Sequence, residues 1–262
     1  MQRLLFLSPD PRQPLPPLPI RSLNFLLALG LISLVFHFAF AQLNYHWNWP
    51  AVYTYRLKFL QGWFNTILIS LFALVLSLLI GLLAALSRRS RFLPLRYAAS
   101  IYIEVIRGTP LLVQILVFFY VVAAAFGVRD RYVVGVLTLA VFSGAYIAEI
   151  IRAGIESIGQ SQLESARSIG LTPAQIYRFI IFPQAVRLIL PPLAGQFVSL
   201  IKDSSLLSVI AINEFTLNAQ EVNAYTFSTL EGYVPLAIGY LVLTLPISFW
   251  TRRLEQQHRY ET

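Results

Sequence analysis

The sequence predicts an all-α integral membrane protein, and two observations carry that prediction. Of its 262 residues 57% are hydrophobic and only 12% are charged, with a mean hydropathy of +0.66, which lies outside the usual range of soluble domains. The chain also holds six apolar stretches of about the 20 residues that a helix needs to cross a membrane. They fall at 23–42, 63–86, 98–126, 132–151, 191–212 and 233–250.

The N-terminal region contains a proline-rich segment followed by the first predicted span. Residues 1–22 include "SPDPRQPLPPLP", which we expect to be extended because proline disfavours a helix interior. The stretch 23–42, with arginines before it and Ala39 to Ala41 near its end, also fits a cleavable signal peptide that would leave Gln42 first. Because the region before the apolar core is unusually long, we expect an uncleaved span.

The next stretches differ in how clearly they predict helices. "WFNTILISLFALVLSLLIGLLAAL", at 63–86, is unbroken and long enough to span with some tilt. The stretch 98–126 contains "EVIRGTP", where Gly108 and Pro110 predict a break. Segment 132–151 is a continuous span, whereas 191–212 starts with two prolines and carries "KD" at its middle. The last predicted span is 233–250.

The distribution of basic residues predicts the orientation. If the N-terminus is cytoplasmic, the only basic residues outside are Arg56, Lys58, Arg129 and Arg131. Short loops rich in Lys and Arg stay in the cytoplasm, so both termini are predicted there. The net charge of +8 then reflects topology and contact with anionic lipid, and we expect no nucleic-acid partner.

The predicted loop between the fourth and fifth spans has its own local signals. It contains "ESARSIGLTPAQIYRFIIFPQ", residues 164–184. Ser161 and Glu164 match a capping box for a helix running towards Ile169, Gly170 can end that helix, and 172–175 match a second start. The bent pair of short helices is either an interfacial link between spans or a knob that docks a soluble partner.

Several motifs resemble one protein family. "ESARSIG" followed by "FPQA" resembles the EAA loop of permease subunits of ABC importers, with Ser165 in place of the first alanine and Phe182 in place of a leucine. "WFNTILIS", "EVIRGTPLLVQ", "AYIAEIIRAGI" and "LPPLAGQFVSLIKDSSLLSVI" resemble its polar amino acid branch, the histidine/glutamine/arginine type. The resemblance covers residues 60–252. It implies a type I ABC importer transmembrane fold of five core helices plus one N-terminal helix, a coupling loop at 153–184 and a tail at 253–262.

The resemblance also implies a function and partners. The chain would be a permease subunit that translocates polar amino acids across the bacterial inner membrane by alternating access. Its partners would be a second permease, identical or homologous, two copies of an ABC ATPase, an external substrate-binding protein and membrane lipid. The short helices at 161–182 would couple it to the ATPase. The residues expected to make this contact are Glu164, Ser165, Ala166, Gly170, Leu171 and Pro173.

The chemistry of ATP hydrolysis is not expected in this chain. It has no Gly-x-x-x-x-Gly-Lys-Ser/Thr phosphate loop, so ATP and Mg would be bound by the partner ATPase. Its three histidines, His37, His46 and His258, have no metal-ligand spacing, and cysteine is absent, so we expect no cofactor and no metal. The chain is therefore predicted to be a pore subunit and not an enzyme.

Polar groups inside predicted spans are the remaining candidates. Glu149, Lys202 and Asp203 are charges at membrane depth, and Glu149 could pair with Lys202. Glu104 with Arg107, and Glu149 with Arg152, are spaced for pairing on one helix face. As an alternative function, the three membrane charges could form the relay of a stand-alone secondary transporter or channel. Candidates for the substrate path are Gln114, Ser143, Tyr146, Gln196 and Ser199.

Overall fold

A computed structural model describes residues 17–42 and 45–258, which form helices and their connections. The chain divides into two compact units, Met1–Trp47 and Asn48–Thr262. Five helices of the described part are long and apolar enough to cross a membrane, and a bent helix pair makes a sixth if it counts as one span. The predicted all-α class is confirmed, and five of the six predicted spans correspond to single long apolar helices, whereas the stretch 98–126 is a bent helix pair.

The first unit contains the helix α1 (Leu18–Ala41). It begins at Leu18, so the prediction of an extended segment as far as residue 22 is wrong for its last five residues. Pro17 is the N-cap and a proline follows in the first turn, where its missing N–H would have no partner in any case. The proline-rich residues 1–16 lie outside the described residues.

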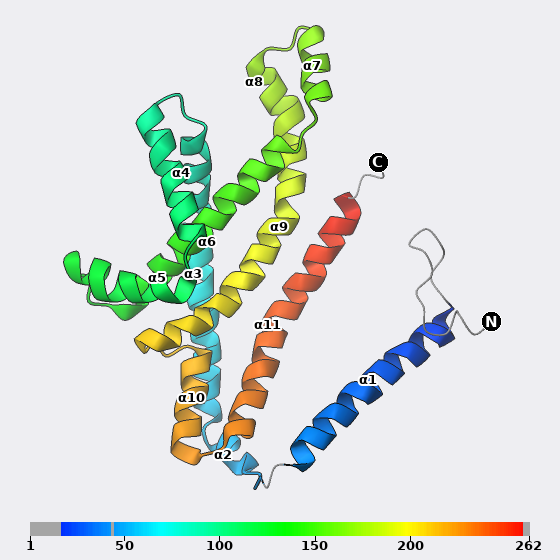
Figure 1. Cartoon of the computed structure of the whole chain (residues 1–262), viewed down its shortest axis with the longest axis vertical. Coiled ribbons are helices and arrows are strands. Elements are labelled where there is room, and N and C mark those ends of the chain that lie inside the picture. The colour runs from blue at the N-terminus through cyan, green and yellow to red at the C-terminus, as the bar shows by residue number, and fades with distance from the viewer. Residues whose placement is uncertain (1–16, 43–44, 259–262) are drawn as a thin grey trace. The chain divides into compact units, whose positions relative to one another are not determined.

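The second unit contains the other helices, shown in Figure 1. In chain order they are α2 (Trp49–Thr54), α3 (Arg56–Arg88), α4 (Leu93–Arg107), α5 (Leu111–Val117), the π-helical η2 (Phe118–Ala123), α6 (Arg131–Glu156), α7 (Gln160–Ser168), α8 (Pro173–Ile176), the π-helical η3 (Tyr177–Ile181), α9 (Phe182–Asp203), the 3₁₀ segment η4 (Ser204–Ile210), α10 (Phe215–Thr226) and α11 (Thr229–His258).

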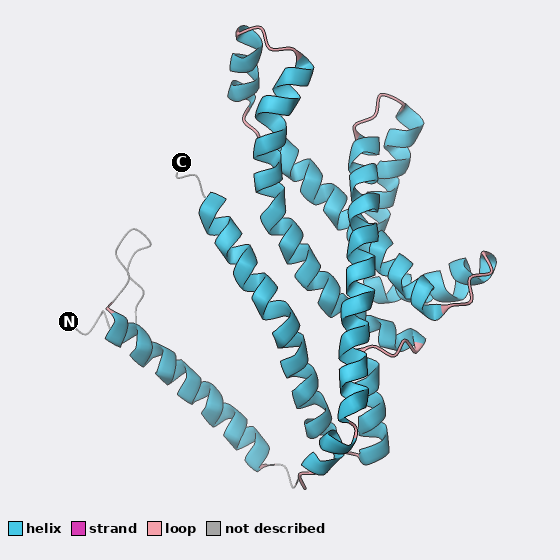
Figure 2. Cartoon of the chain, turned by 180° about the vertical axis from the view of Figure 1, so that it is seen from behind, coloured by secondary structure: helices cyan, strands magenta, loops and turns pink. Residues whose placement is uncertain are grey.

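Several connections of the second unit lie at its two ends, as Figures 1 and 2 show, whereas those after η2 and η4 lie between them. The turn between α3 and α4, the α7–α8 segment and the C-terminal end of α11 lie towards one end. The short helices α2 and α10 lie at the opposite end. The two arginine-bearing turns, at 88–91 and around Arg167, thus share an end, which fits the prediction that they lie on the same side of the membrane.

Helices α3 and α6 approach closely because small residues line their contact. On α3 the buried Ala73, Ser77 and Gly81 are four residues apart and so lie on one face. A Cβ atom at Gly81 would lie 2.6 Å from Ile147 Cγ2 and 2.9 Å from the carbonyl oxygen of Gly144 on α6. Small residues allow this approach in lipid, where packing drives helix association.

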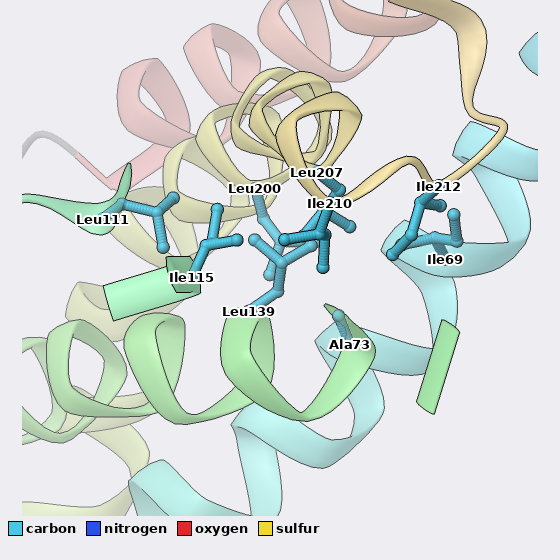
Figure 3. Close-up of a cluster of buried hydrophobic side chains, with 9 residues drawn as sticks. All are labelled: Ile69, Ala73, Leu111, Ile115, Leu139, Leu200, Leu207, Ile210 and Ile212. Carbon is cyan, nitrogen blue, oxygen red and sulfur yellow. The ribbon is translucent and has the colours of Figure 1, made fainter. Parts of the chain in front are cut away.

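A cluster of buried aliphatic side chains holds the other helices to this pair (Figure 3). It joins α3, α5, α6, α9 and η4, and its members are Ile69, Ala73, Leu111, Ile115, Leu139, Leu200, Leu207, Ile210 and Ile212. Each buried leucine or isoleucine adds about 1.5–3 kcal/mol relative to an exposed position in water. In lipid the main gain is close packing.

The break predicted at Gly108 and Pro110 is confirmed. It divides the stretch 98–126 into α4 and α5–η2, which are bent by 112°. The Gln114 side-chain amide covers carbonyls that the break leaves without helical partners. Its Nε2 donates to the Ile106 oxygen at 2.7 Å and to the Thr109 oxygen at 3.2 Å, which satisfies backbone groups that lipid cannot.

The prediction that the fifth span starts at residue 191 is wrong. Pro191 and Pro192 lie inside α9, and helix continues from Pro173 to Ile210. These 38 residues correspond to about 57 Å, well beyond the roughly 30 Å hydrocarbon core. Neighbouring helices allow prolines within a membrane helix. The run is therefore longer than a span requires, and α8 forms its first four residues.

Candidate functional site

The helix α7 ends in a tight, fully bonded turn at Gly170. The N–H of Leu171 donates to the Ala166 oxygen at 3.1 Å, and the N–H of Gly170 donates to the Arg167 oxygen at 3.0 Å. This pair of bonds is a Schellman motif. Gly170 has φ of +82°, a left-handed conformation that glycine adopts without a steric cost. The predicted helix end is confirmed.

The second helix start also follows the prediction. The Gln175 N–H donates to Thr172 Oγ1 at 3.4 Å, and the Thr172 N–H donates to Gln175 Oε1 at 2.8 Å, so the capping box is complete. Pro173 occupies the first helical turn. The wide π-helical turn η3 then precedes Pro183 in the first turn of α9, which fits a residue that lacks the N–H for a helical bond.

The capping box predicted at Ser161 is wrong. The N-cap of α7 is Gly159, without a side-chain bond, and the helix starts at Gln160. Ser161 therefore lies inside the first turn. Ile158, in the short turn after α6, is buried, and we infer that this burial sets the start of α7 ahead of the local signal.

The residues predicted to couple to an ATPase line a compact, exposed turn. Ala166 and Ile176 are buried, and Gln184 Nε2 donates to Gln162 Oε1 at 2.9 Å, which ties α7 to α9. Glu164, Ser165, Gly170 and Pro173 are exposed, and Leu171 is half-buried. Ile169 at the tip is 77% exposed. We call residues 159–184, which contain the residues predicted to contact an ATPase, the coupling segment; its tip is apolar.

A cluster of charges lies where α3, α4 and α6 meet, with Glu149 at its centre. The Glu149 carboxylate lies 2.6 Å from Arg152, 3.1 Å from Arg88 and 3.6 Å from Arg107. The predicted Glu149–Arg152 pair is confirmed. The proposed Glu149–Lys202 pair is wrong, because the carboxylate is already enclosed by these three arginines and Lys202 is exposed on the last turn of α9.

The predicted Glu104–Arg107 pair is also absent among the described residues. Glu104 instead lies 3.9 Å from Arg88, and Arg107 stacks over the Tyr146 ring at 5.4 Å as well as facing Glu149. The more buried carboxylate of Glu149 attracts Arg107 because opposite charges interact more strongly away from water. Asp203 is half-buried beside Lys202 at the end of α9.

The five residues predicted for the substrate path are brought together only in part. Gln196 Nε2 donates to Ser143 Oγ at 3.2 Å, which joins α9 to α6, and Tyr146 lies one turn after Ser143. Ser199 is half-buried on α9. The Gln114 amide donates to the Ile106 oxygen at the bend between α4 and α5, so it stabilises that bend.

A polar network at the opposite end of the unit was not predicted from the sequence. The Glu214 carboxylate caps α10, accepting from the N–H groups of Thr216 and Leu217 at 2.7 Å each, and accepts from the Tyr240 hydroxyl at 3.1 Å. Glu214 is fully buried, and this burial raises its pKa to about 7. In the sequence Glu214 lies between the predicted spans 191–212 and 233–250, and this position alone did not indicate a buried network.

The network explains part of the motif "WFNTILIS". Trp63 Nε1 donates to the Gly239 oxygen at 3.2 Å, Asn65 Nδ2 donates to the Asn213 oxygen at 2.8 Å, and Thr66 Oγ1 accepts from the Phe215 N–H at 3.1 Å. These three side chains hold α3 to α10 and α11. In the sequence these three residues stand out as side chains with hydrogen-bonding groups at the start of the apolar run 63–86.

Comparison with known proteins shows the family. Residues 77–260 match the family described as the binding-protein-dependent transport system inner membrane component. The chain belongs to this family. The resemblance to ABC importer permeases is thereby confirmed, and we refer to the protein below as the permease.

Relatives of the permease come from amino acid transport systems. It is 38% identical over 200 residues to a probable glutamine ABC transporter permease of Bacillus subtilis, GlnM, covering 76% of this chain and 92% of that protein. It is 38% identical over 212 residues to the glutamine permease GlnP of Escherichia coli K12, covering 80% and 97%. The L-cystine permease TcyB of Bacillus subtilis is 36% identical over 197 residues, covering 75% and 84%.

Solved structures agree with this assignment. The permease superposes on a chain from the crystal structure of an amino acid ABC transporter with histidines, with a TM-score of 0.76, 38% identity and coverage of 81% of this chain and all of that one. A chain of the MetNI methionine ABC transporter, at 17% identity, gives a TM-score of 0.62 and coverage of 79% and 99%, which shows the shared fold alone. The predicted type I importer fold is confirmed.

Proposed function

We propose that the permease moves a polar amino acid across the bacterial inner membrane by alternating access, driven by a separate ATPase that grips the coupling segment. The observation that carries this proposal is the coupling segment itself. Two bonded motifs, around Gly170 and Thr172, fix its bend, and Ile169 presents an apolar tip. A rigid exposed turn can transmit a push or pull, whereas a mobile loop would absorb it.

The assembly that suits this segment has four membrane-associated chains. A second permease, identical or homologous, completes the pore, each permease contacts one ATPase that binds ATP and Mg, and an external binding protein delivers the substrate. Both termini are cytoplasmic in this arrangement, as the shared end of the arginine-bearing turns supports. Glutamine, cystine and histidine systems among the relatives support a polar amino acid as the substrate.

The pair Ser143–Gln196 is the best-supported part of the substrate path. It joins α6, which leads into the coupling segment, to α9, which leaves it. A hydroxyl and an amide offer donors and acceptors for an amino acid's carboxylate and ammonium groups. A relative movement of α6 and α9 would open or close this contact, which supports a coupling of ATPase movement to substrate access.

The alternative of a stand-alone secondary transporter is not favoured. Its relay required Glu149, Lys202 and Asp203 to act together, but three arginines surround Glu149 and Lys202 is exposed at the end of α9. The relatives are subunits of ABC transporters. Uptake by reconstituted permease under a membrane potential, without any ATPase, would support the alternative and contradict our proposal.

A matched pair of glycine variants tests the coupling segment. Gly170, with φ of +82°, and Gly127, in the turn before α6 with φ of +68°, both have open space where a Cβ would go. Alanine at either position imposes about 1–2 kcal/mol of backbone strain. We expect Gly170→Ala to lower ATP-driven uptake by proteoliposomes several-fold relative to Gly127→Ala, because only the former strains the segment gripped by the ATPase.

ATPase co-purification gives the second measurement. Gly170→Ala should weaken recovery of the ATPase with the permease, while Gly127→Ala should leave it at the level of the unmodified protein. Equal uptake and equal ATPase recovery for the two variants would contradict the proposed role of the segment.

A further inference from the structure

A cavity of about 890 Å³ lies between the α3–α4 turn and the coupling segment. Its walls come from the last turns of α3, the first turn of α4, the end of α6 and η3. None of the substrate-path candidates lines it, and it is separate from the exposed tip of the coupling segment. This cavity therefore has no role in the function proposed above.

One wall of the cavity is apolar. Leu82 and Leu86 of α3 face it together with Ile151 and Ile155 of α6. The Leu86 side chain is 54% exposed, and both helices are long and apolar enough to span a membrane. These side chains form a continuous apolar surface at the ends of two membrane-spanning helices, so a hydrocarbon chain can extend along it in an apolar environment.

The mouth of the cavity is strongly basic. Four arginines line it, Arg88, Arg89, Arg96 and Arg152, against a single acidic residue, Glu156. Arg88 pairs with Glu149, and Arg152 pairs with Glu149 and Glu156. Arg89 and Arg96 are exposed, and neither has an acidic group within 4 Å among the described residues. Two guanidinium groups are thus available for an anion.

We propose that this cavity binds an anionic phospholipid. The phosphate would lie between Arg89 and Arg96, with the Tyr177 hydroxyl on the rim as a further donor, and an acyl chain would follow Leu82 and Leu86. Guanidinium groups bind phosphate oxygens in a bidentate manner, and basic pockets between spans suit anionic headgroups. The apolar wall favours a lipid over a soluble phosphate, because a free anion would make no use of it.

The position of the lipid gives it a structural consequence. Arg89 and Arg96 belong to the α3–α4 turn, whereas Tyr177 belongs to the coupling segment. A bound headgroup would connect these two parts, which share a cavity and are far apart in sequence. This inference does not depend on which substrate the permease carries.

The test uses the complete importer purified in detergent, with lipids added back and counted by native mass spectrometry. The probes are phosphatidylglycerol, zwitterionic phosphatidylcholine and soluble glycerol phosphate. The variant is Arg89→Gln with Arg96→Gln. Its matched control is Arg91→Gln with Arg253→Gln, which removes the same charge from exposed arginines at the same end of the unit without altering the cavity lining.

We expect tight binding of phosphatidylglycerol that the Arg89/Arg96 variant weakens by about 25-fold, since each basic residue near an anionic lipid contributes roughly five-fold. The control variant should retain the binding, and phosphatidylcholine should bind weakly. Equal loss in both variants would show general surface attraction and overturn the site. Equal competition by glycerol phosphate would show a soluble anion in place of a lipid and would also overturn it.

A fluorescence measurement locates the acyl chain independently. Because this chain has no cysteine, Ile155→Cys gives one labelling position per copy of the permease, in the apolar wall, and the other subunits are used in cysteine-free form. Phosphatidylglycerol with brominated acyl chains should quench a bimane at this position, and the Arg89/Arg96 substitutions should relieve the quenching. Quenching of the same extent by brominated phosphatidylcholine would contradict a headgroup-selective site. A different occupant of the cavity would be an acidic surface of the ATPase. In that case the Arg89/Arg96 variant would recover less ATPase and its lipid binding would be unchanged, which would overturn the proposal.

Discussion

The close contact of α3 and α6 makes a sharp prediction about Gly81. In the Gly81→Ala variant the new Cβ would lie 2.6 Å from Ile147 Cγ2 and 2.9 Å from the Gly144 carbonyl oxygen. The Ile147 side chain is completely buried and the carbonyl belongs to the α6 backbone. Neither neighbour can move freely, so the two helices must separate along their contact.

The expected loss of stability in the Gly81→Ala variant follows from a comparison with Gly195→Ala. Alanine at Gly195 of α9 meets nothing within 4 Å, and both substitutions gain about 0.5–1 kcal/mol from the better helix propensity of alanine. The difference between the two variants therefore isolates overpacking, for which we expect about 1–3 kcal/mol. Unfolding of the purified permease in mixed micelles, followed by circular dichroism, measures this difference.

A double-variant cycle identifies the source of the loss. Ile147→Ala alone should destabilise by about 2–5 kcal/mol by leaving a cavity. Combined with Gly81→Ala it should cost clearly less than the sum of the two, because the cavity accepts the added methyl group. If Gly81→Ala is as stable as Gly195→Ala, or if the two losses simply add, the argument from helix contact is wrong.

Two further predictions concern carboxylates. Glu149→Gln leaves three arginines around a neutral group and should destabilise the permease by about 2 kcal/mol, between the values of exposed and buried ion pairs. The Glu104 side chain is 73% exposed and has one ion-pair contact, at 3.9 Å, so Glu104→Gln should change stability by less than about 0.5 kcal/mol. Equal shifts of the thermal unfolding midpoint for the two variants would contradict this. Burial raises the Glu214 pKa to about 7, above its ordinary value, so its contribution to stability is full below about pH 4.5 and is lost as the pH rises through about 7. Glu214→Gln should flatten the fall of the unfolding midpoint between pH 5 and 8, and an unchanged pH profile would count against the buried carboxyl.

The spans were predictable because lipid imposes a simple requirement on composition and length. Apolar runs of about 20 residues identified every long helix, and the break at Gly108 and Pro110 followed from local backbone chemistry. Helix ends were harder. Pro191 and Pro192 suggested a start that the structure places within α9, because packing against α6 and α11 sustains a helix that isolated propensity would interrupt.

The coupling segment shows the same division between local and tertiary control. The bonds around Gly170 and Thr172 involve residues at most five apart in sequence, and the sequence predicted both turns. Ser161 carried an equally good local signal, but Ile158 fixes the helix start instead. The pairing of Arg88 with Glu149 joins residues 61 apart, and no local pattern indicates which of several arginines would be selected.

The length of the helix from Pro173 to Ile210 carries a mechanical consequence. A continuous helical run, which includes one π-helical and one 3₁₀ segment, links the α7–α8 turn to the aliphatic cluster around Leu207 and Ile210. Like a stiff lever pivoting where Gln196 touches Ser143, it would convert a small tilt at its outer tip into an opposite swing at its inner end. A movement at the α7–α8 turn would in this way reach the helix contacts at the other end of the same run.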